Sequence, residues 1–288
     1  MARQSLWMIA ATFFFSVMFL LSKLCTAETG PFEIMFYRAA VGLAFVSVLM
    51  VRKGVSPRTR HPLAHLRRCA CGLTAFGSEL IALSFIPLAI EQTITYTGPL
   101  FFCLFLLVEC LCLRLPIDRW LLAAAAVGFG GVLLIIRPDV AGINLPGTVF
   151  AFSGAFFAAA VGMCLRNLAR YGEPTERTVF YFMLSGTLVG GIGTLATGGF
   201  QLHSPEVTAL LVGVGIAGGI AQIMVTVAWT YGHALLNAVF QYTGILFAVV
   251  FGAIFFAERP DALCWLGMSV VCAAGIGAAI RQKKARAA

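Results

Sequence analysis

The sequence predicts an all-α integral membrane protein of about ten transmembrane helices. Hydrophobic residues occupy 60% of the 288 positions, charged residues occupy only 11%, and the mean hydropathy is +0.94. A water-soluble chain of this length needs more charged side chains to cover its surface. Long apolar runs separated by short connections make up nearly the whole chain. We therefore expect lipid to be the solvent for most of its surface.

Each predicted span holds about 20 mostly apolar residues, the length that an α-helix needs to cross the hydrocarbon core. The runs begin near Leu6, Phe32, Leu66, Leu88, Ile117, Gly147, Thr178, Pro205, Leu235 and Ala262. Turn signals with Gly or Pro separate them, in order Gly30-Pro31, Ile86-Pro87, Leu115-Pro116, Arg137-Pro138, Glu173-Pro174, Gly198-Gly199 and Arg259-Pro260. We interpret the first run as a membrane span and not as a signal peptide, because no A-x-A cleavage site follows it.

The distribution of Lys and Arg predicts the orientation of the chain. With a cytoplasmic N-terminus, sixteen of the 20 basic residues fall on the inner side, including a cluster between Arg52 and Arg68 and the C-terminal tail. Only Arg137 and Arg259 fall on the outer side, and Lys23 and Arg38 lie within spans. We expect both termini to be cytoplasmic and the protein to reside in the inner (plasma) membrane. The net charge of +8 then faces the membrane surface, so we expect no nucleic-acid partner.

An internal repeat predicts the architecture. Residues 82–101 and 228–247 align without gaps, and Tyr96-Thr97-Gly98 matches Tyr242-Thr243-Gly244. We therefore divide the chain into a first repeat, 1–141, and a second repeat, 142–288, of five spans each. An odd number of spans turns the second repeat upside down relative to the first. Inverted repeats are typical of secondary transporters, which bind their substrate near the midplane where the repeats meet.

At these residues the sequence resembles the drug/metabolite transporter superfamily, in its EamA-type ten-helix branch. The resemblance covers essentially the whole chain. Its motifs are the Tyr37-Arg38 pair, the segment Ile86-Pro87-Leu88-Ala89, the Thr97-Gly98-Pro99-Leu100 segment and the Glu258-Arg259 pair. The first repeat departs from the family pattern, because Leu113-Arg114 stands where the resemblance leads us to expect Glu-Arg. The resemblance implies an inner-membrane carrier, often an exporter of amino acids or related metabolites, and other branches carry nucleotide sugars or cationic drugs.

Ionisable side chains at membrane depth are candidates for function, because their burial is costly unless they are paired or hydrated. Glu79 lies in the middle of the third predicted span, on one helical face with Gly72 and Ala75. It is suited to binding a substrate ammonium group or carrying a coupling proton. The alternative is a structural carboxyl, either protonated or paired with Arg38. For Lys23 and Arg38 we favour structural pairing over binding of a substrate carboxylate.

Two matching polar stripes predict a cavity lined from both repeats. Glu91 and Thr95 are spaced i, i+4 on the fourth span, and Asn237 and Gln241 occupy the equivalent positions on the ninth. We favour the cavity over the alternative, in which these side chains form hydrogen bonds between helices without a ligand. Glu91 lies near the end of its span and has a second alternative, exposure to water.

Further candidates for substrate binding lie on the fourth, eighth and ninth spans. They are Gln92 and Tyr96, Gln222 and Trp229, and Tyr242, which repeats Tyr96. Trp229 has two interpretations that we leave open, a stacking platform for the substrate or an anchor at the membrane interface. We expect the central cavity between the third, fourth, eighth and ninth spans.

The sequence favours a secondary carrier that exports amino acids or related small metabolites by alternating access. No Walker A motif is present, which disfavours ATP-driven transport by this chain. A membrane-embedded enzyme would need clustered Asp, His or Glu residues, whereas the acidic residues here are scattered. We expect no enzymatic activity, no cofactor and no metal, because neither the nine cysteines nor the four histidines have metal-ligand spacing. A channel remains a further alternative, and we expect a monomer to suffice.

Overall fold

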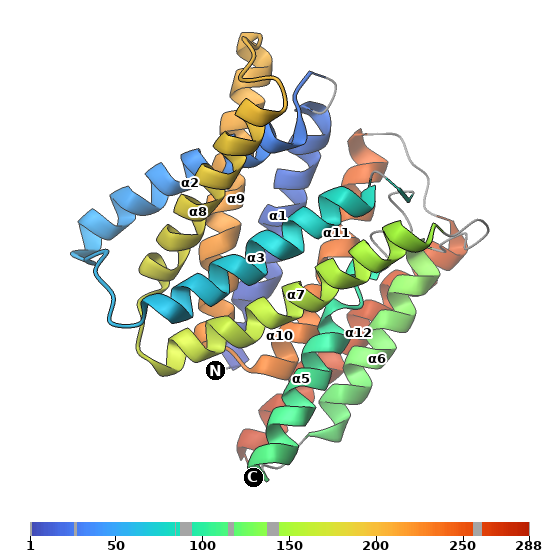
Figure 1. Cartoon of the computed structure of the whole chain (residues 1–288). Helices are drawn as coiled ribbons and strands as arrows, with labels where there is room; N and C mark the ends of the chain where they lie inside the picture. Colours follow the sequence, from blue (N-terminus) through green and yellow to red (C-terminus); the bar gives the residue numbers. More distant parts are fainter. Residues whose placement is uncertain are drawn as a thin grey trace.

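In the computed structural model, the chain folds into α-helices joined by short loops (Figure 1). The structure describes residues 2–25, 28–83, 85–86, 94–114, 118–136, 144–255 and 261–287. Within these ranges there is no β-strand. The all-α prediction is therefore confirmed for the part of the chain that is described.

Eleven helices are present in the described ranges. Those of the first half are α1 (Ala2–Cys25), α2 (Pro31–Lys53), α3 (Pro62–Leu83), α5 (Gly98–Leu113) and α6 (Arg119–Ile136). Those of the second half are α7 (Leu145–Arg170), α8 (Thr175–Ala196), α9 (Pro205–Tyr231), α10 (Ala234–Gln241), α11 (Thr243–Phe255) and α12 (Ala262–Ala287). The predicted span starts agree closely with these bounds, except that the starts predicted near Leu88 and Ile117 lie outside the described residues.

Local sequence signals explain where several helices begin and end. Pro205 occupies the first turn of α9, and the Ser204 side chain accepts a hydrogen bond from a backbone N–H of that turn. The Asn144 side chain caps α7 in the same way. Gly54 ends α2 with a φ of 63°, a left-handed conformation that glycine adopts without strain.

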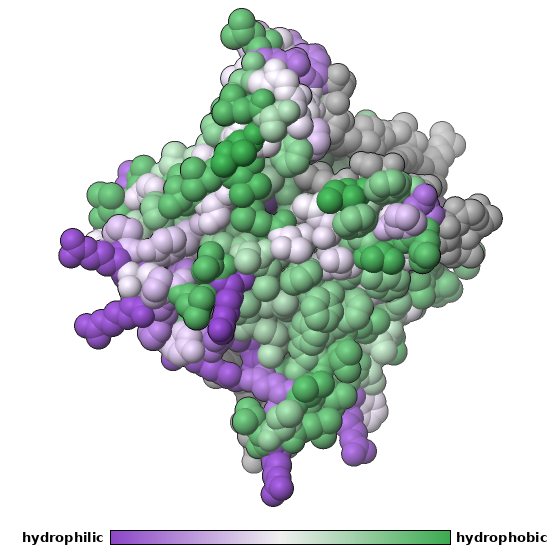
Figure 2. Space-filling view, in the orientation of Figure 1, coloured by the Kyte–Doolittle hydropathy of each residue, from purple (hydrophilic) through white to green (hydrophobic). Residues whose placement is uncertain are grey.

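Seven of the described segments are long and apolar enough to cross a membrane, and two shorter apolar helices, Gly98–Leu113 and Ala262–Ala278, accompany them. Helix α3 is also long, at 22 residues, but less apolar. Many large hydrophobic side chains stay exposed, among them Trp120, Leu145 and Ile192. Figure 2 shows hydrophobic residues over much of the visible face. Exposed apolar surface on this scale fits contact with lipid.

The helices pack mainly as four pairs, α1 with α9, α3 with α7, α2 with α8, and α6 with α12. In each pair one helix comes from each half of the chain. Glycines let the paired backbones approach closely. A Cβ added to Gly190 of α8 would lie 2.7 Å from the backbone nitrogen of Phe36, and one added to Gly131 of α6 would lie 2.9 Å from the carbonyl oxygen of Gly267.

Both chain termini lie at the same end of the helical bundle (Figure 1). The Ser5 hydroxyl accepts a hydrogen bond from the backbone N–H of His233, and Arg281 pairs with Asp118. We call this end, with the loops 54–61 and 171–174, the basic end. Hydrophilic side chains gather along the left and lower edges in Figure 2. The opposite end, with the loops 28–30 and 197–204, we call the distal end.

Candidate functional site

The ninth span is interrupted at Tyr242, which separates α10 from α11. Beside the interruption, the Thr243 hydroxyl donates to the carbonyl oxygen of Phe240 at 2.7 Å. The fourth span repeats this feature directly before α5, where the Thr97 hydroxyl donates to the carbonyl oxygen of Ile94 at 2.6 Å. Interrupted helices place backbone polar groups at membrane depth, so they occur where protein or a water-filled cavity surrounds them.

Helix α1 supplies polar partners to the interruption in the ninth span. The hydroxyl oxygens of Thr12 and Thr243 are 2.8 Å apart, and the Ser16 hydroxyl donates to the carbonyl oxygen of Gly244 at 3.2 Å. Ser16 is buried, and α1 belongs to the first half of the chain. These hydrogen bonds therefore join the two halves inside the bundle.

The structure brings the two repeat tyrosines, Tyr96 and Tyr242, together at this junction. Their ring centroids are 6.4 Å apart. The Tyr96 hydroxyl faces the start of α11, where a Cβ added to Gly244 would lie 3.3 Å from it. Tyr242 is fully buried against Gly128 of α6, and its hydroxyl has no hydrogen-bond partner among the described residues. A buried, unpaired hydroxyl is available to a solute or a water molecule.

Glu79 and Arg38 form an electrostatic pair between α3 and α2. The Glu79 side chain is half-buried and packs on α7, where a Cβ added to Gly154 would lie 3.0 Å from its Cγ. Its negative charge acts on the buried guanidinium of Arg38. The Arg38 guanidinium also lies 5.6 Å from the centre of the Phe76 ring. The charges of Glu79 and Arg38 thus interact, and both alternatives for Glu79, structural pairing and a role in binding, stay predictions.

Arg68 is a buried cation that the sequence analysis did not single out. Its side chain, on the first turns of α3, is 2% exposed, and its guanidinium carbon lies 3.8 Å from the centre of the Phe182 ring of α8. The adjacent residue, Arg67, is exposed. Arg68 lies on the same helical face as Gly72, one turn along from it, so the stripe that we drew through Gly72 and Glu79 includes Arg68 when it is extended by one turn.

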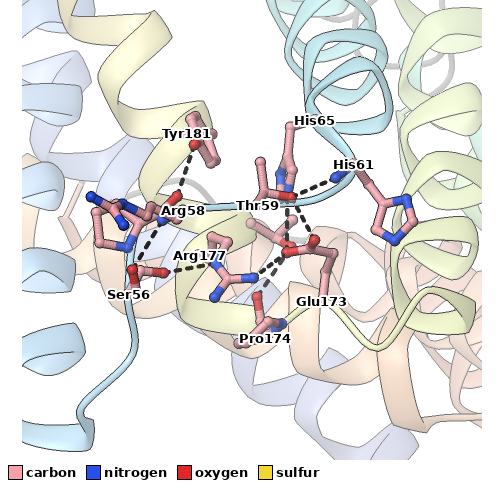
Figure 3. A network of polar contacts seen from close by, with 11 residues as sticks. Ser56, Arg58, Thr59, His61, His65, Glu173, Pro174, Arg177 and Tyr181 are labelled. Atoms are coloured by element: carbon pink, nitrogen blue, oxygen red, sulfur yellow. Dashed lines mark hydrogen bonds and ion pairs between the residues drawn. The ribbon is translucent and has the colours of Figure 1, made fainter.

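A network of polar contacts joins the two halves at the basic end (Figure 3). We call it the Glu173 network, after the acid at its centre, whose side chain is 4% exposed. The Glu173 carboxylate accepts hydrogen bonds from the Thr59 hydroxyl at 2.5 Å and from the Arg177 guanidinium at 2.8 Å. The Nε2 atom of His65 lies 3.2 Å from the same carboxylate. Burial alone would raise the pKa of the Glu173 carboxyl, but Thr59, Arg177 and His65 together hold this pKa below its ordinary value.

The network also holds the loop 54–61 against α8. The Arg177 guanidinium donates to the carbonyl oxygen of Ser56, and the Tyr181 hydroxyl donates to that of Pro57, each at 2.8 Å. Nearby, Lys53 pairs with Glu176 at 2.6 Å. These contacts therefore join the two halves of the chain at this end of the bundle.

A hollow of about 420 Å³ lies beside the Glu173 network. It is lined by the end of α2, the loop 171–174, the start of α8 and the last turns of α9, including Lys53, Glu173, Thr175 and Tyr231. A volume of this size accommodates a small metabolite. The hollow opens at the basic end, so it is the natural vestibule on that side.

Among the described residues, one contact between a histidine and a carboxylate joins the halves at the distal end. The Nε2 atom of His203, in the loop before α9, lies 2.9 Å from a carboxylate oxygen of Glu33 in the first turn of α2, and both side chains are at most 5% exposed. Buried polar contacts thus join the two halves at both ends of the bundle, on either side of the interrupted helices.

Comparison with known proteins identifies the family. The EamA-like transporter family matches the chain twice, over residues 3–137 and 145–279. The chain belongs to the EamA-like transporter family. The resemblance that we drew from the sequence motifs is confirmed, and the protein is a multi-pass membrane transporter.

Two EamA relatives have named substrates, and they differ. The pseudopaline exporter CntI of Pseudomonas aeruginosa strain UCBPP-PA14 is 30% identical over 279 residues, which cover 96% of this chain and 95% of CntI. A riboflavin transporter of Rhizobium johnstonii is 24% identical and covers 94% of this chain and 89% of that protein. A solved crystal structure, 18% identical, superposes with a TM-score of 0.84 over 96% of this chain and 97% of its own. The last comparison supports the fold alone.

Within this EamA fold, the candidate residues of α9 and α10 are buried. Trp229 is 5% exposed and packs against Phe102 of α5, with ring centroids 4.4 Å apart, so the alternative of an interfacial anchor is wrong. Gln222 is 4% exposed. The Asn237 amide, which is fully buried, donates to the carbonyl oxygen of Ala228 at 2.6 Å and ties α10 to the end of α9. This contact is of the interhelical kind that we weighed against the cavity.

The remaining candidates are less enclosed or lie outside the described residues. Gln241, the last residue of α10, and Thr95 are half-buried beside the interruptions of their spans. Glu91 and Gln92 lie outside the described residues, as does much of the fourth span, so the cavity that we expected between the third, fourth, eighth and ninth spans stays a prediction. A small cavity of about 10 Å³ lies elsewhere, between α2, α3 and α8.

Proposed function

We propose that this protein is a secondary transporter that exports amino acids or related small metabolites by alternating access. Its family and its named relatives are transporters, and the relative at 30% identity is named an exporter. We place the protein in the inner membrane with both termini in the cytoplasm, so that the basic end faces the cytoplasm as the positive-inside rule requires. The solute then enters from the hollow of about 420 Å³ at that end.

The two halves act as inverted repeats in this proposal. Three observations support the arrangement. The family matches each half separately. When each helix is replaced by its counterpart in the other half, the pair α1–α9 becomes the pair α7–α3, which is also present. The pairs α2–α8 and α6–α12 each become themselves. The interruptions beside Thr97 and Thr243 have the same side-chain hydrogen bond.

The observation that carries the proposal is the placement of polar groups where the halves meet. The interrupted helices, Tyr96 and Tyr242 lie inside the bundle, and buried contacts between the halves lie at both ends. Alternating access needs such an arrangement, because each end must open while the other stays closed. Glu33–His203 closes the distal end, and the Glu173 network closes the basic end. When the contacts at one end break while those at the other end hold, the centre of the bundle is exposed to one side of the membrane.

Counterflow in proteoliposomes tests this function. Vesicles loaded with unlabelled amino acids are assayed for uptake of labelled threonine, homoserine, cysteine, phenylalanine and glutamate. A carrier exchanges internal for external solute and accumulates label transiently, whereas an open channel shows no such stimulation. We expect Glu79→Gln and Gln241→Ala to reduce the exchange, and the exposed Glu206→Gln and Gln201→Ala to leave it unchanged. Absence of exchange with every amino acid would refute the amino-acid cargo, and label equilibration without stimulation would refute the carrier mechanism.

A further inference from the structure

Arg68 is buried without a carboxylate partner among the described residues. Its Nε and Nη1 atoms are both buried and make no hydrogen bond. The ionisable groups nearest to it are the neutral thiols of Cys69, Cys71 and Cys164 and the like-charged Arg38. The face of the Phe182 ring is its principal contact, 3.8 Å from the guanidinium carbon. A cation–π contact offsets only part of the cost of burying a guanidinium group.

Arg38 has a similar environment one helix away. Its Nε atom is buried without a hydrogen-bond partner, and α9 closes over it, since a Cβ added to Gly218 would lie 3.3 Å from that atom. The Phe76 ring lies on another side at 5.6 Å. Glu79 supplies one negative charge. Among the described residues of this region, the two arginines and one glutamate therefore carry a net charge of about +1 when all three are ionised.

The other acidic side chains near α3 and α8 are already engaged. Glu173 binds Thr59 and Arg177, Glu176 binds Lys53, and Glu109 accepts hydrogen bonds from Arg166 and Arg170. None of these acids is available to Arg68. An uncompensated buried charge costs several kcal/mol, and no acid among the described residues compensates this one, which favours a partner that arrives with the solute.

The cavity beside Arg38 is small in this structure. The cavity of about 10 Å³ between α2, α3 and α8 is lined by Arg38, Leu73, Phe76, Phe182 and Met183, among others. It has room for about one water molecule. Phe182 lines this cavity and its ring also contacts Arg68, and Met183 is a flexible side chain that yields easily. Thr175, which lines the hollow at the basic end, lies about 10 Å along α8 from Phe182.

We propose that Arg38 and Arg68 form a two-cation site that binds the acidic groups of the transported solute. The inference rests on the proposed transport function and narrows its cargo to organic anions that carry two or more carboxylates. Each guanidinium presents a planar fork of donors that matches a carboxylate. The solute enters from the hollow, displaces Phe182 and Met183, and supplies the negative charge that Arg68 lacks. Glu79 then binds an ammonium group on the same solute, or stays paired with Arg38 when the solute has none.

Ligand-dependent thermal stability of the purified protein tests this site directly. The probes are citrate and L-glutamate, with L-glutamine as the neutral counterpart of glutamate, at equal ionic strength. Ligands that bind the folded state raise its melting temperature in proportion to occupancy. We expect citrate and glutamate to raise the melting temperature and glutamine to have a much smaller effect. Glutamine that matches glutamate would overturn the proposal.

The variants are Arg68→Met, Arg68→Lys and Arg38→Gln, with the exposed neighbour Arg67→Gln as the matched control. Loss of one charged hydrogen-bonding group weakens anion binding by roughly tenfold to a hundredfold. We expect this loss in Arg68→Met and Arg38→Gln, an intermediate loss in Arg68→Lys, and the wild-type response in Arg67→Gln. If Arg68→Met does not fold, Arg68→Lys and Arg38→Gln carry the test. A wild-type anion response in the Arg68 and Arg38 variants would overturn the proposal.

The counterflow assay separates failure of this site from failure of the transport function. Exchange of neutral amino acids that is unaffected in Arg68→Met would refute the anion site and leave the carrier intact. A rise in melting temperature with citrate or glutamate that depends on Arg68, without exchange of any solute, would refute the carrier mechanism. It would leave the proposed anion site intact.

Discussion

Replacement of Glu173 by glutamine tests whether the Glu173 network holds the basic end closed. The substitution keeps the size of the side chain but removes its charge, and its amide NH₂ cannot accept the hydrogen bond from Arg177. Hydrogen bonds to charged groups contribute about 1.5–3 kcal/mol each. Glu173 accepts two, and glutamine retains one neutral acceptor, so we expect the closed end to lose about 2–3 kcal/mol. The side chain is only 4% exposed, so solvent screens little of this effect.

Hydrogen–deuterium exchange of the loop 54–61 measures the opening. The network holds this loop through the carbonyl oxygens of Ser56 and Pro57. A loss of 2–3 kcal/mol corresponds to opening that is about 30- to 160-fold more frequent, with exchange accelerated by the same factor where opening limits it. Glu206→Gln is the matched control, because Glu206 is exposed and lies at the start of α9, far along the chain from this loop. Unchanged exchange in Glu173→Gln would show that the network does not hold the loop, and equal acceleration in Glu206→Gln would show that the effect is not specific.

Three further outcomes follow from the geometry. The pKa of Glu173 is held below its ordinary value of 4.5, so its contribution to the closed end is complete at neutral pH and is lost only as pH falls through the lowered pKa. Exchange of the loop 54–61, corrected for the intrinsic rate, therefore rises only in solution more acidic than the ordinary pKa of a glutamate. Gly215→Ala should lower the melting temperature by an amount equivalent to about 1–3 kcal/mol, because its Cβ would overlap α2, whereas Gly77→Ala, with open space around it, should not lower it; equal melting temperatures would refute the close contact. Asn237→Ala should cost about 1 kcal/mol in thermal unfolding, because Ala228 keeps a second hydrogen bond from a backbone N–H, and a loss above about 3 kcal/mol would indicate a further role for the buried amide.

Hydropathy and charge predicted most of the architecture, because the bilayer allows few alternatives. A span must be apolar over about 20 residues and must satisfy its own backbone, so nearly every apolar run in this chain is a helix. The repeat of Tyr96-Thr97-Gly98 in Tyr242-Thr243-Gly244 located both helix interruptions, although it did not reveal them as interruptions. Thr and Gly are tolerated inside membrane helices, and only the structure shows that α10 ends at Gln241.

The candidate site was harder to predict, because exposure depends on contacts between distant segments. Trp229 was ambiguous in the sequence, and its burial depends on Phe102 of α5, which lies 127 positions away. Asn237 was correctly selected as polar and buried, but its partner, the carbonyl oxygen of Ala228, is a backbone group that no side-chain pattern reveals. The Glu173 network forms because the loop 54–61 contacts the loop 171–174. These loops are far apart in the sequence, and no motif in either one predicts the contact.

Arg68 was missed for a different reason, since it belonged to a cluster that the positive-inside rule already explained. Arg67 and Arg68 are adjacent, yet one is exposed and the other is 2% exposed. Helical phase distinguishes them, because Arg68 shares a face with Gly72 and Glu79 and Arg67 does not. The positive-inside rule explains why several basic residues lie near the end of a span. It does not predict which of their side chains point into the bundle.

The low hydropathy of α3 follows from the same stripe. Helix α3, at 22 residues, falls outside the seven apolar spans, and it carries His65, Arg68 and Glu79 on its buried or half-buried positions. A span this polar is stable in a bilayer when protein or water covers its polar face, and here α7 and α8 pack against it. A chain under selection for stability alone would replace Arg68 with an apolar residue, because buried ion groups are often dispensable for folding. The free-energy cost of burying Arg68 falls on α3, the helix that runs from the Glu173 network to the centre of the bundle. In our proposal, this is the path on which a transported anion binds a positive charge.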